Sequence, residues 1–60
     1  MKGIFDPEAV ARGDVVLVER GRRVLRATVA SAPEHGWVLV KLPGIPGPTS
    51  VPTRSIRLAR

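Results

Sequence analysis

Three stretches in the middle of the chain, at 15–19, 23–30 and 37–42, are mostly apolar. Each stretch is rich in Val and Leu, and each break between the stretches contains Gly or Pro. Short apolar stretches interrupted by Gly or Pro are typical of antiparallel strands joined by short turns. The pattern predicts a three-stranded meander over residues 13–42.

Gly and Pro mark the turns and loops around these strands. The two turns of the meander fall at 20–22 and 32–36, and Gly36 is expected at a positive φ. The stretch 43–48 contains three Pro and two Gly, so it can be neither a helix nor a central strand. We expect a stiff, protruding loop there. A short strand around Val51, a 3₁₀ turn over 52–55 and a last strand over 56–58 are expected to follow.

The N-terminal segment has the features of a short helical turn. Asp6 is a favourable N-cap residue and Pro7 suits the first helical position, which predicts one turn over 7–11. Phe5, before the cap, would then pack against Val10 as a hydrophobic staple. This segment is expected to cover one open side of the sheet.

The position of each residue along its strand also predicts which side chains face the core, because successive side chains of a strand point to opposite faces. The residues expected to point inward are Val16, Val18, Leu25, Ala27, Val29, Val38, Val40, Leu42, Ile56 and Leu58. Those expected to point outward are Val15, Leu17, Arg26, Thr28, Ala30, Trp37, Leu39, Lys41 and Arg57. Both faces of the first strand are therefore apolar.

The runs GDVVLVERGRR, ATV, WVLVKL and VPTRSIRL follow one another along residues 13–59. They resemble the small SH3-like barrels of the KOW and Tudor-like kind. Those barrels open with a Gly-Asp pair, continue as alternating hydrophobic residues, turn at a Gly, and end with a 3₁₀ turn and a short strand. The resemblance implies an all-β, five-stranded SH3-like barrel over 13–60, preceded by a cap segment at 1–12. It is a resemblance of pattern, so it implies a fold more than an activity.

The size and the absence of cysteine limit how the fold can be stabilised. A chain of 60 residues buries only about 60% of its unfolded surface. Without Cys it can form neither a disulfide nor a thiolate zinc site, so a partner or a homo-oligomer is the remaining way to bury more apolar area. No apolar run approaches the roughly 18 residues needed to span a membrane. The N-terminus does not read as a signal peptide, and we expect a cytoplasmic protein.

The charge is strongly basic, with ten Lys and Arg against five Asp and Glu, a formal net charge of +5. A small basic chain attracts polyanions, and nucleic acid is the commonest partner of that kind. We expect non-sequence-specific binding of DNA or RNA by neutralisation of phosphates. The candidate residues are Arg20, Arg22, Arg23, Arg26, Lys41, Arg54 and Arg57, with Trp37 as the candidate for stacking on a base. The alternatives are a basic surface that serves solubility and a Trp37 that packs on the rim of the sheet.

A second hypothesis follows from the outward apolar residues. Val15, Leu17, Trp37 and Leu39 would form an apolar patch of the kind that marks a protein interface. Such an interface would serve a homo-oligomer or docking on another protein, with the loop at 43–48 as a further contact.

Catalysis is the weakest hypothesis. The lone His35 has only its neighbour Glu34 as an acid partner, and adjacent residues do not make a poised acid–base pair. Asp6, Glu8 and Asp14 are typical of caps and turns, and no residues have metal-ligand spacing. We therefore expect no catalytic residue, no metal and no cofactor.

One enzyme family of this fold is similar in size and in its Gly-Asp opening, the small plasmid-borne dihydrofolate reductases. Their active-site run Val-Gln-Ile-Tyr is absent, because the corresponding positions 50–53 read Ser-Val-Pro-Thr. We do not expect reductase activity.

Overall fold

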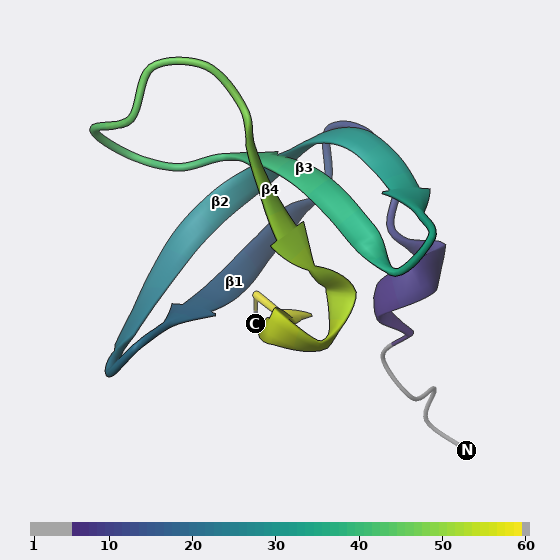
Figure 1. Cartoon of the computed structure of the whole chain (residues 1–60), viewed down its shortest axis with the longest axis horizontal. Coiled ribbons are helices and arrows are strands. Elements are labelled where there is room, and N and C mark those ends of the chain that lie inside the picture. Colours follow the sequence, from purple (N-terminus) through teal and green to yellow (C-terminus); the bar gives the residue numbers. More distant parts are fainter. Residues whose placement is uncertain (1–5, 60) are drawn as a thin grey trace.

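The structure is a computed structural model that describes residues 6–59, without the side chain of Leu58. Five antiparallel strands form one sheet: β1 (Val15–Arg20), β2 (Arg23–Glu34), β3 (Trp37–Lys41), β4 (Thr49–Pro52) and β5 (Ile56–Leu58). Two single turns of 3₁₀ helix, η1 (Pro7–Ala9) and η2 (Thr53–Ser55), precede β1 and β5 (Figure 1). The all-β prediction is confirmed, including the 3₁₀ turn before the last strand.

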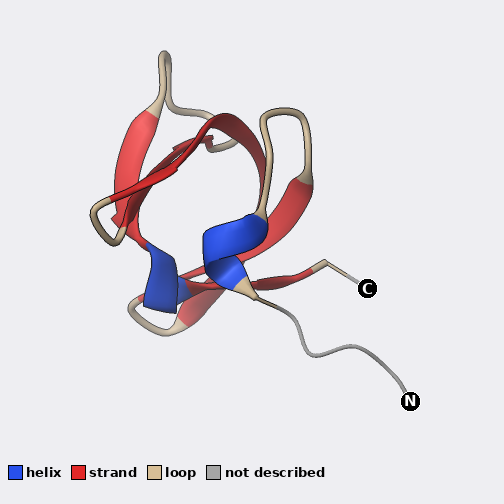
Figure 2. Cartoon of the chain, turned by 90° about the vertical axis from the view of Figure 1, so that its right-hand side faces the viewer, coloured by secondary structure: helices blue, strands red, loops and turns tan. Residues whose placement is uncertain are grey.

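The strands are ordered β4-β3-β2-β1-β5, and the sheet curls around an interior (Figure 2). β4 and β5 are its two edges, and within residues 6–59 they are not hydrogen-bonded to each other. The five-stranded barrel is thus a strongly curved sheet that is not closed. β4 and β5 do not pair because η2 connects them. This 3₁₀ turn changes the direction of the chain at the point where a hairpin turn would be needed to pair the two strands.

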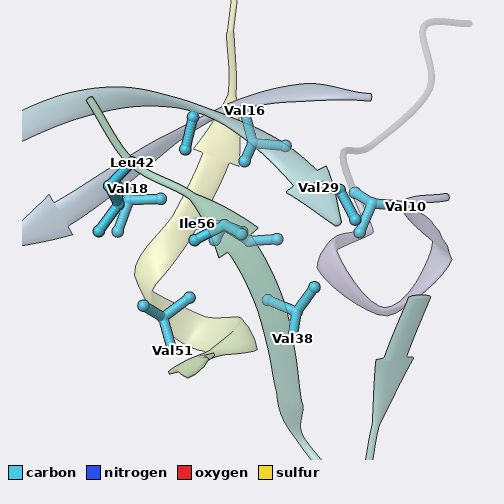
Figure 3. Close-up of a cluster of buried hydrophobic side chains, with 10 residues drawn as sticks. Val10, Val16, Val18, Val29, Val38, Leu42, Val51 and Ile56 are labelled. Carbon is cyan, nitrogen blue, oxygen red and sulfur yellow. The ribbon is translucent and has the colours of Figure 1, made fainter. Parts of the chain in front are cut away.

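The core consists of small branched side chains (Figure 3). Its buried residues are Val10, Val16, Val18, Ala27, Val29, Val38, Val40, Leu42, Val51 and Ile56. Seven of these ten are Val, a β-branched residue that packs well on a pleated surface. The inward predictions are confirmed for every described side chain, although Leu25 is only partly buried. Leu58 was also predicted to point inward, but its side chain lies outside the described part of the chain.

β2 is longer than the alternation predicted. The connection expected at 32–36 is wrong, because β2 continues to Glu34 and only His35 and Gly36 form the turn. Both turn residues have positive φ, 54° for His35 and 80° for Gly36. Two consecutive positive φ values are typical of the type I′ hairpin turn, whose twist matches that of the flanking strands. The positive φ of Gly36 was predicted, and that of His35 was not.

Two β-bulges allow β2 to extend so far. The register between β2 and β3 shifts between Val29 and Ser31 and again between Ser31 and Glu34. Each shift places one extra residue on β2, which bends the strand and strengthens its twist. Pro33 lies in the second bulge, where its missing N–H is tolerated. The first half of β2 therefore pairs with β1, and the second half pairs with β3 alone.

The N-terminal turn is shorter than predicted. Asp6 caps η1 as expected, since its carboxylate accepts a hydrogen bond from the backbone N–H of Glu8 at 3.0 Å. The turn predicted over 7–11 ends at Ala9, because Val10 adopts an extended backbone (φ −70°, ψ 152°) that directs its side chain into the core. Phe5, the predicted partner of Val10, lies outside the described residues.

Hydrogen bonds join η1, η2 and the β2–β3 turn into what we call the tied end. The hydroxyl of Thr53, in η2, donates to the carboxylate of Glu8, in η1, at 2.6 Å. The backbone N–H of Thr53 donates to the carbonyl of Gly36 at 2.9 Å. Thr53 is the one buried polar residue among those described. A single residue therefore connects three segments that are distant in sequence.

Candidate nucleic-acid interface

The end of the β1–β2 hairpin projects beyond the rest of the sheet (Figure 1). β5 pairs with β1 only as far as Val18, and β3 pairs with β2 only from Thr28 onward. Within the segment 19–26, residues 19–24 therefore form a two-stranded ribbon with no third strand beside it, whereas Leu25 and Arg26 lie opposite residues of β1 that also pair with β5. We call the segment 19–26 the basic ribbon, because it contains four Arg residues and one acidic residue.

The turn of the hairpin fixes how these arginines face one another. Gly21 has a φ of 62° and, with Arg22, forms a two-residue turn in which Arg20 lies directly opposite Arg23. Gly at the first position is typical of the type II′ turn. Two like charges directly opposite each other destabilise a sheet. The chain thus has an unfavourable juxtaposition at its most exposed end, which an anion bound there would relieve.

The arginines of the basic ribbon lie on both of its faces. Arg26 is opposite Leu17 and shares the outer face, whereas Arg20 and Arg23 continue the face that carries Val18. Arg22 lies in the turn itself. Two arginines therefore lie on one face near the tip of the hairpin, and a third lies on the other face further from the tip.

Glu19, the one acidic residue of the basic ribbon, is paired with Arg57. The Nε of Arg57 donates to the carboxylate of Glu19 at 2.6 Å, with the two side chains 61% and 42% exposed. This hydrogen bond lowers the pKa of Glu19 below its ordinary value and raises the pKa of Arg57 above its own. Arg57 therefore neutralises Glu19, and the four arginines of the ribbon keep their charge.

Lys41 and Arg54 lie outside the basic ribbon. Lys41 is opposite Thr28 on the outer face, which makes it a diagonal neighbour of Arg26. The expected sharing of one face by Arg26 and Lys41 agrees with this register. Arg54 is exposed in η2, outside the ladder of paired strand positions.

Trp37 lies away from the basic ribbon, beside the β2–β3 turn. It is 51% exposed and is opposite Glu34 on one side and Pro52 on the other. Leu39, 38% exposed, lies next to it between Ser31 and Ser50. These side chains border a shallow hollow of about 190 Å³, which is lined by Ser31, Ala32, Glu34, Trp37, Val38, Leu39 and Ser50.

The predicted outer apolar patch is divided in two. Val15 and Leu17 are on β1, and the polar residues Thr28 and Ser31 of β2 separate them from the Trp37 side. Leu17 is half-buried between positions 26 and 57, which are both Arg. Each apolar area is therefore smaller than the four-residue surface that the sequence predicted.

Two exposed apolar residues were not predicted. Val24, 57% exposed, lies in the basic ribbon opposite Glu19, and Ile45, 43% exposed, lies in the loop at 43–48. The exposure of Val24 could have been predicted, because Val24 lies two residues before the outward-facing Arg26 on the same strand. Ile45 carried no such signal, since the prolines around it interrupt any period.

Within residues 6–59, no three His, Asp or Glu side chains are placed to hold a metal ion. Among the same residues, no helix has the length and apolar character needed to cross a membrane. No protein-family model, curated protein or solved structure matches the chain. The SH3-like resemblance therefore stays a prediction from the pattern of the sequence.

Proposed function

We propose that this protein binds nucleic acid without sequence specificity, through the basic ribbon supported by Lys41 and Arg57, and that it does so in the cytoplasm. The observation that carries this proposal is the concentration of four arginines on a projecting ribbon whose one carboxylate is already paired. The protein acts by neutralising phosphates and not by catalysis. The strand order, with β5 beside β1, supports the SH3-like resemblance.

The chemistry of arginine suits this role. Its planar guanidinium binds phosphate through two parallel hydrogen bonds and is less strongly hydrated than an ammonium group. Arg20, Arg22, Arg23 and Arg26 are all exposed, and no hydrogen bond or ion pair holds them within the described residues. They are therefore available to an anion without breaking a contact of the fold.

The proposal is tested by fluorescence anisotropy on mixed DNA and RNA oligonucleotides over a series of salt concentrations. Each phosphate contact contributes about 0.7–0.9 to the slope of log affinity against log salt. We expect a slope of several units, and a slope lower by about two to three in the variant with Arg22, Arg23 and Arg26 replaced by Ala.

Arg12→Ala is the control for this experiment, because Arg12 is exposed in the turn before β1, at the opposite end of that strand from the ribbon. The control should bind nearly as well as the unaltered chain. Circular dichroism should show the same fold in all three proteins. An affinity unchanged by the triple substitution would remove the basis of the proposal.

A second candidate function is protein interaction through Trp37 and Leu39. The observation that favours it is the exposure of both side chains beside a hollow. Self-association would raise the mass measured by light scattering, and Leu39→Glu would return that mass to one chain. Val15→Glu, on the other apolar area, shows whether Val15 and Leu17 take part. A single-chain mass at all concentrations would count against a homo-oligomer.

A further inference from the structure

The shape of the basic ribbon restricts the kind of nucleic acid that it can enter. Two paired strands lie about 4.8 Å apart, and their side chains widen the ribbon further. The major groove of B-form DNA is about 12 Å wide and admits a two-stranded ribbon, whereas the minor groove is only about 6 Å wide. We infer that the ligand is a B-form DNA duplex and that residues 19–24, the two-stranded part of the basic ribbon, lie in its major groove. This inference rests on the proposed function.

The distribution of charge on the ribbon agrees with insertion in a groove. A protein that lies on a single backbone needs cations on one face only. Here Arg20 and Arg23 are on one face, Arg22 is at the turn, and Arg26 is on the other face at the base of the two-stranded part. A ribbon inserted in a groove has a row of phosphates on each side, so cations on both faces can each reach one row.

The position of Trp37 argues against a single-stranded ligand. Proteins that bind single strands combine a cationic groove with aromatic side chains on which the bases stack. Trp37, the one aromatic residue within 6–59, adjoins the β2–β3 turn, which lies across the molecule from the hairpin tip (Figure 1). The longest dimension of the molecule, 38 Å, runs along this direction. Stacking and phosphate binding therefore cannot act on the same few nucleotides.

The groove geometry also separates DNA from duplex RNA. The major groove of an A-form helix is deep and narrow, and side chains do not enter it to read bases. Its wide, shallow minor groove offers no two close walls to a narrow ribbon. The basic ribbon should therefore bind duplex RNA only from outside, with fewer phosphates neutralised.

The test compares three labelled ligands of one sequence and length at the same ionic strength: duplex DNA, single-stranded DNA and duplex RNA. We expect duplex DNA to bind at least about tenfold more tightly than either of the others, because one or two more phosphates are reached. Equal affinities, or tighter binding of single strands or RNA, would overturn the inference and leave the proposed function standing. No binding to any of the three would instead refute the proposed function.

The groove itself is identified by competition. Netropsin occupies the minor groove and should leave the affinity for duplex DNA unchanged, whereas methyl green occupies the major groove and should displace the protein. The opposite result would overturn the placement in the major groove. The double variant Arg20→Ala, Arg23→Ala removes one face of the ribbon and should lower the salt slope by about two, while Arg12→Ala should not change it. A double variant with an unchanged slope would show that this face does not contact phosphate.

Discussion

The basic ribbon and the tied end are formed by the two ends of one strand, β2, yet they are held in different ways. At the tied end, Thr53 links η1, η2 and the β2–β3 turn, and Val10 adds its side chain to the core. The basic ribbon is held by the ladder between β1 and β2 and by the exposed pair of Glu19 and Arg57, and it carries no fully buried side chain. Stability is thus concentrated at one end of the strand and exposed charge at the other.

This difference has a physical basis in local stability. Segments with few buried apolar contacts open at a lower free energy than the core of the same protein. Groups that bind a partner are commonly placed on such segments and positioned by a rigid scaffold. The curved sheet is that scaffold here, and the basic ribbon can adjust to a ligand without disturbing the core. Two pairs of variants and two single variants test this comparison.

The largest effect is expected from two valines of the same hairpin. Val18→Ala removes a fully buried side chain and should lower the free energy of unfolding by about 2–3 kcal/mol. Val24→Ala, in the ribbon, should change it by less than about 0.5 kcal/mol. Urea unfolding followed by circular dichroism measures both. Equal losses would mean that the ribbon is as tightly packed as the core.

The next effect concerns the link at the tied end. Thr53→Val keeps the shape of the side chain and removes its hydrogen bond to Glu8, which should cost about 1–2 kcal/mol of unfolding free energy. Thr28→Val is the matched control, because Thr28 is exposed on β2, and it should be nearly neutral. If the two threonine variants unfolded alike, the hydroxyl of Thr53 would not stabilise the link between η2 and η1.

Stability and binding should change in opposite directions at the basic ribbon. Arg23→Thr removes the like-charge pair with Arg20 and should stabilise the fold by about 0.2–1 kcal/mol. The same variant should lower the salt slope of DNA binding by about one. Urea unfolding and anisotropy on one sample test both effects. A variant that gained stability and kept its full salt slope would show that Arg23 has no part in binding.

The smallest effect is expected from the exposed pair of Glu19 and Arg57. Because Arg57 lowers the pKa of Glu19 in the folded state, the pair stabilises the fold above the ordinary pKa of 4.5. That contribution is lost as the pH falls through the lowered pKa. In Arg57→Ala the pKa of Glu19, followed by NMR of its side-chain carboxyl, should rise towards 4.5. A pKa that did not move would mean that the pair does not form in solution.

Much of the fold could be predicted from the sequence, because short stretches rich in Val and Leu at 15–19, 23–30 and 37–42 are separated by Gly or Pro. Along 23–30 the polar Arg26 and Thr28 also indicate which face points outward. The full length of β2 could not be predicted. Ala32 and Pro33 read as a break in the strand, and only the bulges explain how Pro33 is accommodated. A bulge depends on the partner strand, so alternation within one strand cannot reveal it.

The residues of the candidate site were predicted from the sequence, but their arrangement in space was not. The arginines at 20–23 were identified from their density in the sequence. The placement of Arg20 and Arg23 on one face depends on the register that the Gly21–Arg22 turn sets, which puts them opposite each other. The pairing of Glu19 with Arg57 could not be predicted, since it depends on β5 lying beside β1 across 38 residues of sequence.

The open sheet also has a consequence for how the protein avoids aggregation. An exposed edge strand presents unpaired backbone groups to which another chain can add. Pro52, in β4, has no N–H to offer, and Pro48 stands directly before that strand. On the other edge, β5 is only three residues long and carries the charged Arg57. Each edge thus bears a feature that opposes the stacking of copies into a continuous sheet.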